Sequence, residues 1–505
     1  MKTYPLNEDT SFTGKWFLPQ LDNSPHLAGT LTWGDRCAEL SLNGTFTPQR
    51  GAIFGDEVHD YTAVHGVTTG SERVSLLSAM QVGKNVSIGA GGFAESERIS
   101  SNFLVVGAHV TEQSLYSEVS IRVPGLELWI GRSGVTQTII PQTTDCPSSV
   151  VYHIEHLREE IIQIPAIFGT LSFGFEHRYS GDRISEIHAR ISCHMTIRPD
   201  EPQCINWFLD QFGKASTLLS FLAGVSMAED QISAKLSGTN ESVAVLVNLR
   251  MTQTCKYKSR HDFFMLRNDM GEALEPVIQN WFEQYDSIAT PSQLALSVLN
   301  TNDLWSHIEF LSLMQALEGF HRAVSTGLYT SEEEYKAIHD SLCMAIPDGI
   351  GSDHRDALKS RIRYGNEISL RKRLDSLASR LPDSLRVVIL GNGGSIPRSW
   401  VVTRNYYTHW DDASRNSILD GMDMHRAAVR IRLFLRVLYL RFVGISEAAI
   451  QKSLVNASYE SQYLIQLNSA MHRKANPGST EGAIMHITLG KLCANDKANE
   501  PDQPT

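Results

Sequence analysis

The chain has 505 residues, about three times the ~150 residues of a typical domain, so two or three domains are expected. Hydrophobic residues make up 42% and charged residues 20%, which excludes wholesale disorder, collagen and coiled coil. The formal net charge of -11 excludes a uniformly basic nucleic-acid coat, so any contact with nucleic acid must be local.

The first part of the chain has the pattern of an antiparallel β domain. From Leu27 to about Arg198, short runs of β-branched and apolar residues are separated by Gly, Asn, Asp and Pro. Residues 183–197 alternate with period two over much of their length, as a half-buried strand does. We therefore predict a sandwich or barrel of short strands, without a solenoid or propeller repeat.

The pattern becomes helical after Pro202. Apolar residues have helical spacing over 206–227, and a short strand-like segment follows at 242–251. From Gly271 onward, the apolar spacing predicts helices almost throughout. The expected helices cover 302–324, 331–346, 354–365, 399–410 and about 417–443. Polar connections between them favour an antiparallel bundle.

These patterns predict an α+β protein, with a mostly antiparallel β region followed by an all-α bundle. We place the β-rich region at residues 1–265 and the helical region at 266–458. Residues 459–505 form a C-terminal extension that loses apolar periodicity, so its end is expected to be disordered.

The cysteines and the hydropathy pattern predict a cytoplasmic protein without membrane contact. No CxxC pair occurs, and the odd number of cysteines favours reduced thiols over a disulfide framework or zinc ribbon. The N-terminus has no apolar run typical of a secretory signal. The most apolar stretch, 431–443, is interrupted by arginines and is shorter than the ~20 residues of a membrane span. The seven cysteines are Cys37, Cys146, Cys193, Cys204, Cys255, Cys343 and Cys493.

Two patterns superficially suggest bound groups. Residues 387–397, VVILGNGGSIP, look like a strand running into a dinucleotide-binding loop, but Ile396 replaces the third glycine and helices lie on both sides. We predict an inter-helix loop there, with Pro397 opening the next helix. His153 and His156 match no helical metal motif, and on one strand they would face opposite sides. We therefore expect neither a metal nor a cofactor.

The segment RNYYTH, residues 404–409, carries a candidate catalytic set. On a helix, Asn405 and His409 lie about 40° apart, whereas Arg404 lies about 140° from His409. An imidazole can exchange protons near neutral pH, and a guanidinium can hold a phosphate. This set suits phosphodiester cleavage by transesterification without a metal. The alternative is structural: Arg404 in a surface ion pair, and His409 capping the helix beside Trp410.

The residues resemble those of a known family. Arg404, Asn405 and His409 are similar to the motif of HEPN ribonucleases, which is Arg, a polar residue, three further residues and His. Residues 309–323, including Glu318, resemble the ApeA-like branch of this family, as do residues 361–377. The N-terminal segments 14–19, 27–33 and 53–66 resemble the ApeA N-terminal domain. The resemblance covers roughly residues 10–455.

This resemblance implies a metal-independent endoribonuclease of anti-phage abortive infection. The ribose 2′-OH would attack the adjacent phosphate and leave a cyclic phosphate. By position, His409 would be the general base or acid, Arg404 would stabilise the phosphorane, and Asn405 would orient the site. A homodimer or higher homo-oligomer would bring two motifs to one cleft. The N-terminal domain would act as the sensor or restraint for an unidentified phage-derived trigger.

Local charge favours RNA as the substrate, with tRNA as one candidate. Residues 355–380 hold eight Lys+Arg against three acids, and residues 404–441 hold seven Arg against four Asp. Arg361 and Arg363 are candidate phosphate contacts, and Tyr406 and Tyr407 are candidate stacking partners. The alternatives are solvated helix faces for the charges, core positions for Arg430 and Arg436, and core or dimer-interface positions for the tyrosines.

A second functional class stays open. In it, the HEPN bundle is a non-catalytic module for dimerisation and for binding RNA or protein. The joint presence of Arg404, Asn405 and His409 argues against this class. Nucleotide transfer is a third class, but the Gly-Ser and paired Asp of a nucleotidyltransferase are not evident.

Overall fold

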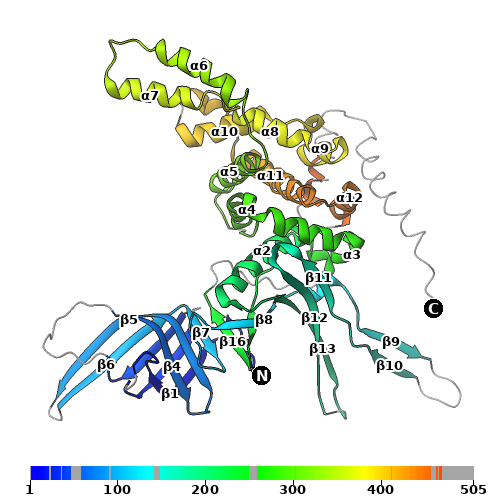
Figure 1. Cartoon of the computed structure of the whole chain (residues 1–505). Coiled ribbons are helices and arrows are strands. Elements are labelled where there is room, and N and C mark those ends of the chain that lie inside the picture. Colours follow the sequence, from blue (N-terminus) through cyan, green and yellow to red (C-terminus); the bar gives the residue numbers. More distant parts are fainter. Residues whose placement is uncertain are drawn as a thin grey trace. The chain divides into compact units, whose positions relative to one another are not determined.

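A computed structural model of the chain describes residues 2–21, 24–35, 37–46, 59–89, 92–141, 148–182, 184–239, 241–248, 259–301, 303–410, 412–456, 462–464 and 466–468 (Figure 1). Several sequence-based expectations lie outside these residues. They concern Cys146, Cys255 and Cys493, the segments 53–58 and 249–251, and nearly all of the extension 459–505.

The chain forms two compact units. The first consists of Met1–Asp262 and Leu266–Phe282, and the second of Phe263–Met265 and Glu283–Thr505. The boundary therefore falls inside a long helix, α4 (Leu274–Leu299). The division of the chain at 265/266 into sensing and nuclease regions stays a prediction.

The first unit begins with a closed antiparallel barrel (Figure 1). Strand β6 pairs with both β3 and β5, so the strand order β5, β4, β1, β2, β3, β6 returns to β5. Closure leaves these strands without an open edge. The strands are β1 (Thr10–Phe17), β2 (Leu27–Gly34), β3 (Cys37–Asn43), β4 (Asp60–Thr68), β5 (Arg73–Gly89) and β6 (Gly92–Ser101).

Alternating apolar residues fill the barrel. Trp16 and Trp33 are buried, and each indole N–H donates to a backbone carbonyl. The Trp16 ring lies against Gly66, where an added Cβ would be 2.3 Å from the ring. Strand β5 is longer than the short strands predicted here, because it pairs with β4, β6 and β7 and is bent by an irregularity between Gln81 and Gly83.

The same sheet continues beyond the barrel through β7, β16, β15, β8, β13, β12 and β11. The strand predicted at 183–197 begins five residues further on, as β13 (His188–Pro199). The amphipathic stretch 206–227 forms α2 (Ile205–Ala223), whose Phe208 and Phe212 are buried.

The remaining strands are β7 (Phe103–Val106), β8 (Leu115–Arg122), β9 (Val135–Ile140), β10 (Ser149–Ile154), β11 (Glu160–Ile164), β12 (Gly169–Ser180), β14 (Gln203–Cys204), β15 (Gln231–Leu236) and β16 (Ser242–Val247). This unit also has two short α-helices, α1 (Leu126–Ile130) and α3 (Arg267–Met270). His153 lies near the end of β10 and His156 follows the strand, and both residues are exposed.

The second unit is the predicted helical bundle, and the α+β fold class is confirmed. Its centre is the pair α5 (Ser306–Val324) and α11 (Gly421–Phe442), whose apolar faces are buried. The other helices are α6 (Glu332–Met344), α7 (Ser352–Arg363), α8 (Leu370–Ser379), α9 (Asp383–Leu390), α10 (Arg398–His409) and α12 (Glu447–Asn456). Figure 1 shows α6 and α7 as a hairpin that projects from the other helices.

The start of α11 corrects the sequence-based boundary near residue 417. Residues Asp412–Ser417 form a separate 3₁₀ turn, η5, and α11 begins only after Asp420. The Asp420 carboxylate accepts from the Asp423 N–H at 2.8 Å, which is an N-cap. Asp420 therefore defines the helix start.

The glycine-rich segment is an inter-helix loop, as predicted. The apolar residues before it belong to α9, and Gly391, Gly393 and Gly394 have positive φ. Pro397 is the N-cap residue of α10. No helix among the described residues is long and apolar enough to cross a membrane.

Candidate active site

Helix α10 carries the candidate catalytic residues, and His409 is its last residue. Trp410 ends the helix in the left-handed region, with φ 54°, and its N–H donates to the Tyr406 carbonyl at 2.6 Å. A left-handed non-glycine residue is uncommon and strained. The imidazole of His409 thus lies at the exposed end of α10 beside an exposed Trp410.

The two faces of α10 have different roles. Trp400 and Thr403 are buried, and the Thr403 hydroxyl accepts from the Leu419 N–H at 2.9 Å, which attaches the segment before α11. Asn405 and His409 lie on the exposed face, as their spacing predicts. No described residue forms a hydrogen bond with the His409 imidazole. The ring is therefore accessible for proton transfer.

Arg404 is held by a carboxylate on α5. Its Nη2 donates to Glu318 Oε2 at 2.9 Å, and its Nη1 donates to Asn405 Oδ1 at 3.3 Å. The pair is partly buried, with side-chain exposures of 20% for Arg404 and 13% for Glu318. A guanidinium has five N–H donors, so three are left for another acceptor. The ion pair anticipated in the structural alternative exists, and it leaves room for a phosphate.

Glu318 begins a chain of charged side chains behind Arg404. It also accepts from Arg322 Nη2 at 3.2 Å, and Arg322 donates to Glu367 at 2.7 Å. Glu367 in turn pairs with the buried Arg373 at 2.8 Å. Arg404 is thus tied to α5 and α8 by alternating charges, which fix its orientation.

His321 lies at the far end of this chain. Its Nδ1 is 3.3 Å from Arg373 Nη1, and the ring is fully buried. Burial, and then the neighbouring arginines, lower the pKa of His321 to about 4. The imidazole is therefore neutral near pH 7 and can accept from Arg373. Sequence reasoning missed His321, although its helical spacing from Glu318 placed the two on one face.

The basic clusters at 355–380 and 404–441 have fewer exposed charges for RNA contact than the charge count suggests. Arg430, Arg432 and Arg436 of α11 are buried, and Arg373 of the first cluster is buried as well. Arg430 Nη1 donates to the Ile389 carbonyl at 2.8 Å, so it serves the packing of α9 on α11. The core alternative for Arg430 and Arg436 is therefore confirmed, and most of the charge on α11 cannot contact RNA.

The other candidate RNA contacts differ in exposure. Arg361 and Arg363 are exposed near the end of α7. Tyr406 and Tyr407 are half-buried and pack with Trp410, with centroid distances of 5.9 and 6.2 Å to its rings. The Tyr407 ring also lies nearly parallel to that of His307, at 5.9 Å and 19°.

Comparison with known proteins gives two family matches. A family model described as ApeA N-terminal domain 1 matches residues 11–281, more than half of the chain. A second, described as Apea-like HEPN, matches residues 311–449, which include the helices from most of α5 to the start of α12. No curated protein and no solved structure matches the chain.

Proposed function

The chain belongs to the ApeA-like HEPN family, and we propose on this basis that it is an anti-phage endoribonuclease acting through α10. HEPN domains are generally associated with nucleases, and they commonly dimerise and act on RNA. The proposed reaction needs no metal and leaves a cyclic phosphate.

The observation that carries the proposal is the arrangement of α10. His409 is exposed and accessible, while Arg404 is pre-oriented by Glu318 and retains free N–H donors. In the proposed reaction His409 takes or gives the proton of the ribose or leaving oxygen. Arg404 stabilises the charge that develops on the phosphorane. Asn405, whose Oδ1 accepts from Arg404, presents its amide N–H groups to the phosphate.

Two copies of α10 are needed to assemble this site. Arg404 and His409 are five residues apart, which places them about 140° apart around the helix. The Arg404 and His409 side chains therefore leave one α10 in different directions, although the Arg404 guanidinium reaches back to Asn405. In the proposed dimer, two copies of α10 face each other across a two-fold axis, and each supplies the group that the other directs elsewhere. The proposed enzyme is thus a cytoplasmic homodimer.

RNA binding and control are assigned to other parts of the chain. Arg361 and Arg363, which are both exposed near the end of α7, are proposed to contact RNA phosphates. The N-terminal region is proposed to restrain the nuclease until a phage-derived trigger is present.

The test compares wild type, His409→Ala and His354→Ala in cells challenged with phage. His354 is an exposed histidine on α7 and serves as the matched control. Protection and new RNA ends with cyclic phosphates are expected for wild type and His354→Ala, and neither for His409→Ala. Equal protection and identical RNA ends in all three strains would refute the proposed reaction.

The ion pair of Arg404 favours one alternative function. If Arg404 serves only to hold α10 on α5 through Glu318, the bundle is a non-catalytic module that dimerises and binds RNA or protein. Purified dimer that binds RNA but cuts none, with or without lysate of infected cells, would support this alternative.

A further inference from the structure

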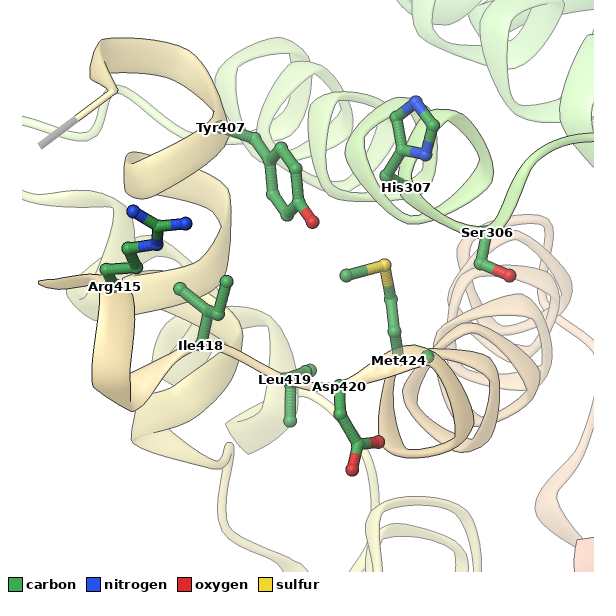
Figure 2. Close-up of a pocket in the computed structure, with 9 residues that line it drawn as sticks. Ser306, His307, Tyr407, Arg415, Ile418, Leu419, Asp420 and Met424 are labelled. Atoms are coloured by element: carbon green, nitrogen blue, oxygen red, sulfur yellow. The ribbon is translucent and has the colours of Figure 1, made fainter. Parts of the chain in front are cut away.

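A pocket of about 480 Å³ lies beside α10 in the helical unit (Figure 2). This volume is within the range of sites that hold small ligands, roughly 300–1,000 Å³. Tyr407 from α10 and His307 from the first turn of α5 lie on one side of it. Met424 and Ile418 face these rings across the opening (Figure 2).

The pocket combines flat aromatic surfaces with an unpaired cation. The rings of Tyr407 and His307 are nearly parallel, so a flat ligand can be oriented parallel to both rings. Arg415 on η5 lines the same pocket, and no described residue pairs with its guanidinium. The Tyr407 hydroxyl likewise has no hydrogen-bond partner among the described residues. Both polar groups are therefore available to a ligand.

The acidic residue of the pocket does not oppose an anionic ligand at the rings. Asp420 is the N-cap of α11, and its carboxylate accepts from the Asp423 N–H at 2.8 Å. In Figure 2 this side chain points away from Tyr407 and His307.

We infer that this pocket binds one nucleotide of single-stranded RNA, with the base on the rings of Tyr407 and His307 and a phosphate at Arg415. Aromatic rings stack on any base, and Met424 supplies a soft apolar surface opposite. Arg415 can hold a phosphate bidentately. Stacking tolerates every base, so the pocket anchors the strand more than it reads its sequence.

The position of the pocket on α10 decides which nucleotide it takes. This step rests on the proposed function. Tyr407 and His409 are two residues apart, which places them about 160° apart around the helix. The base in the pocket therefore does not belong to either of the two nucleotides that are joined by the phosphate at His409 of the same chain. It belongs to a nucleotide further along the strand, and it anchors the strand outside the cleavage point.

The test measures binding of a labelled 2′-O-methyl RNA of about twelve nucleotides, which lacks the attacking hydroxyl and matches a typical single-strand site. The full chain with His409→Ala is the parent protein, and fluorescence anisotropy gives the dissociation constants. Tyr407→Ala and His307→Ala in this parent should each weaken binding roughly tenfold. Tyr407→Phe keeps the ring and should weaken binding less than Tyr407→Ala does. Arg415→Ala should lower the slope of log affinity against log salt by about 0.7.

Unchanged affinity in both alanine variants, or no RNA binding by the parent, would overturn the inference. Thermal melts of each variant identify any loss of folding, and Tyr407→Leu, which keeps an apolar side chain, provides a second variant without the ring. Cleavage by the wild-type protein is scored separately. If the pocket variants lose binding while wild type cuts no RNA, the pocket inference holds and the proposed nuclease function fails.

Discussion

At the scale of single residues, contacts with residues distant in sequence hold the Arg404 guanidinium in place and surround the His321 imidazole. Glu318 holds Arg404 from 86 positions away, and Arg373 contacts His321 from 52 positions away. Both contacts join helices through charges with little exposure to water, where electrostatic interactions are strengthened. Glu318 is therefore a positioning residue in the proposed reaction, and it touches no substrate.

Glu318→Gln should reduce RNA cleavage without abolishing it. Glutamine can still accept from Arg404, but a hydrogen bond between neutral and charged partners is weaker than an ion pair, so we expect a roughly fivefold to tenfold fall in kcat with little change in KM. Glu318→Asp should retain more activity, since it keeps the charge. The exposed Glu332→Gln on α6 is the matched control. Wild-type kcat in Glu318→Gln would show that Arg404 needs no positioning.

The stability of the helical unit should fall in mild acid because of His321. Its folded pKa is about 4, below the ordinary value of 6.5, so the unfolded chain binds more protons between these pH values. The contribution to unfolding free energy is therefore fully present above about pH 6.5 and is lost as the pH falls towards 4. The charged groups facing the ring are Arg373, Arg380, Arg322 and Glu318.

This pH effect is measured by chemical denaturation of wild type and His321→Gln. Glutamine keeps an acceptor for Arg373 but does not titrate. The difference in unfolding free energy between the two proteins should shift against wild type as the pH falls from 6.5 to 4. Parallel curves over this range would contradict the low pKa of His321.

At the scale of elements, α11 organises the bundle with buried arginines. Arg432 pairs with Glu309 of α5 at 2.5 Å and donates to the carbonyls of Val298, Leu299 and Thr301 at the end of α4. These carbonyls are among the unsatisfied acceptors at a helix C-terminus. One side chain of α11 thus holds two other helices.

Arg432→Met should destabilise the fold by about 3–5 kcal/mol, because it leaves the Glu309 carboxylate, whose side chain is only 13% exposed, without its partner. Arg426→Met removes an exposed arginine from the same helix, paired with Asp423 at the surface, and should cost at most about 1 kcal/mol. Urea denaturation of the two variants provides the comparison. In the double variant Arg432→Met with Glu309→Leu, part of the loss should be recovered. Equal stability of the two arginine variants would contradict the structural role of Arg432.

At the scale of the whole molecule, the proposed site requires two chains. On a single α10, the Arg404 and His409 side chains leave the helix in different directions. Arg404 is held by its ion pair with Glu318, and His409 is the last residue of the helix. Activity in the proposed enzyme is therefore linked to assembly, and it should rise with protein concentration in the range of the dimer dissociation constant.

Mixing inactive variants tests this arrangement. Arg404→Ala and His409→Ala proteins should each cut no RNA. When they are mixed and exchanged, random pairing makes half of the dimers mixed, and each mixed dimer has one complete site of two, so about a quarter of wild-type activity is expected. A mixture that remains inactive, although sedimentation shows mixed dimers, would place both groups of each working site in one chain.

The local pattern of the sequence was enough to predict most helices and strands and to find the motif at residues 404–409. The α+β order, the bundle, the inter-helix loop at 391–394 and the exposed spacing of Asn405 and His409 all follow from patterns that repeat within a few residues. Such patterns encode the face that an element buries, because each element buries one side. The family resemblance is likewise carried by local segments, and the family matches at residues 11–281 and 311–449 confirm the family.

Only the tertiary structure decided the partners and the burial of the charges. The count of seven arginines over 404–441 does not distinguish Arg432 in the core from Arg426 at the surface. The pairing of β6 with both β3 and β5, the Glu318 partner of Arg404 and the pocket at Tyr407 and His307 also join distant segments. A sequence lists charges and spacings along one chain, whereas accessibility and pairing depend on which elements pack together in space.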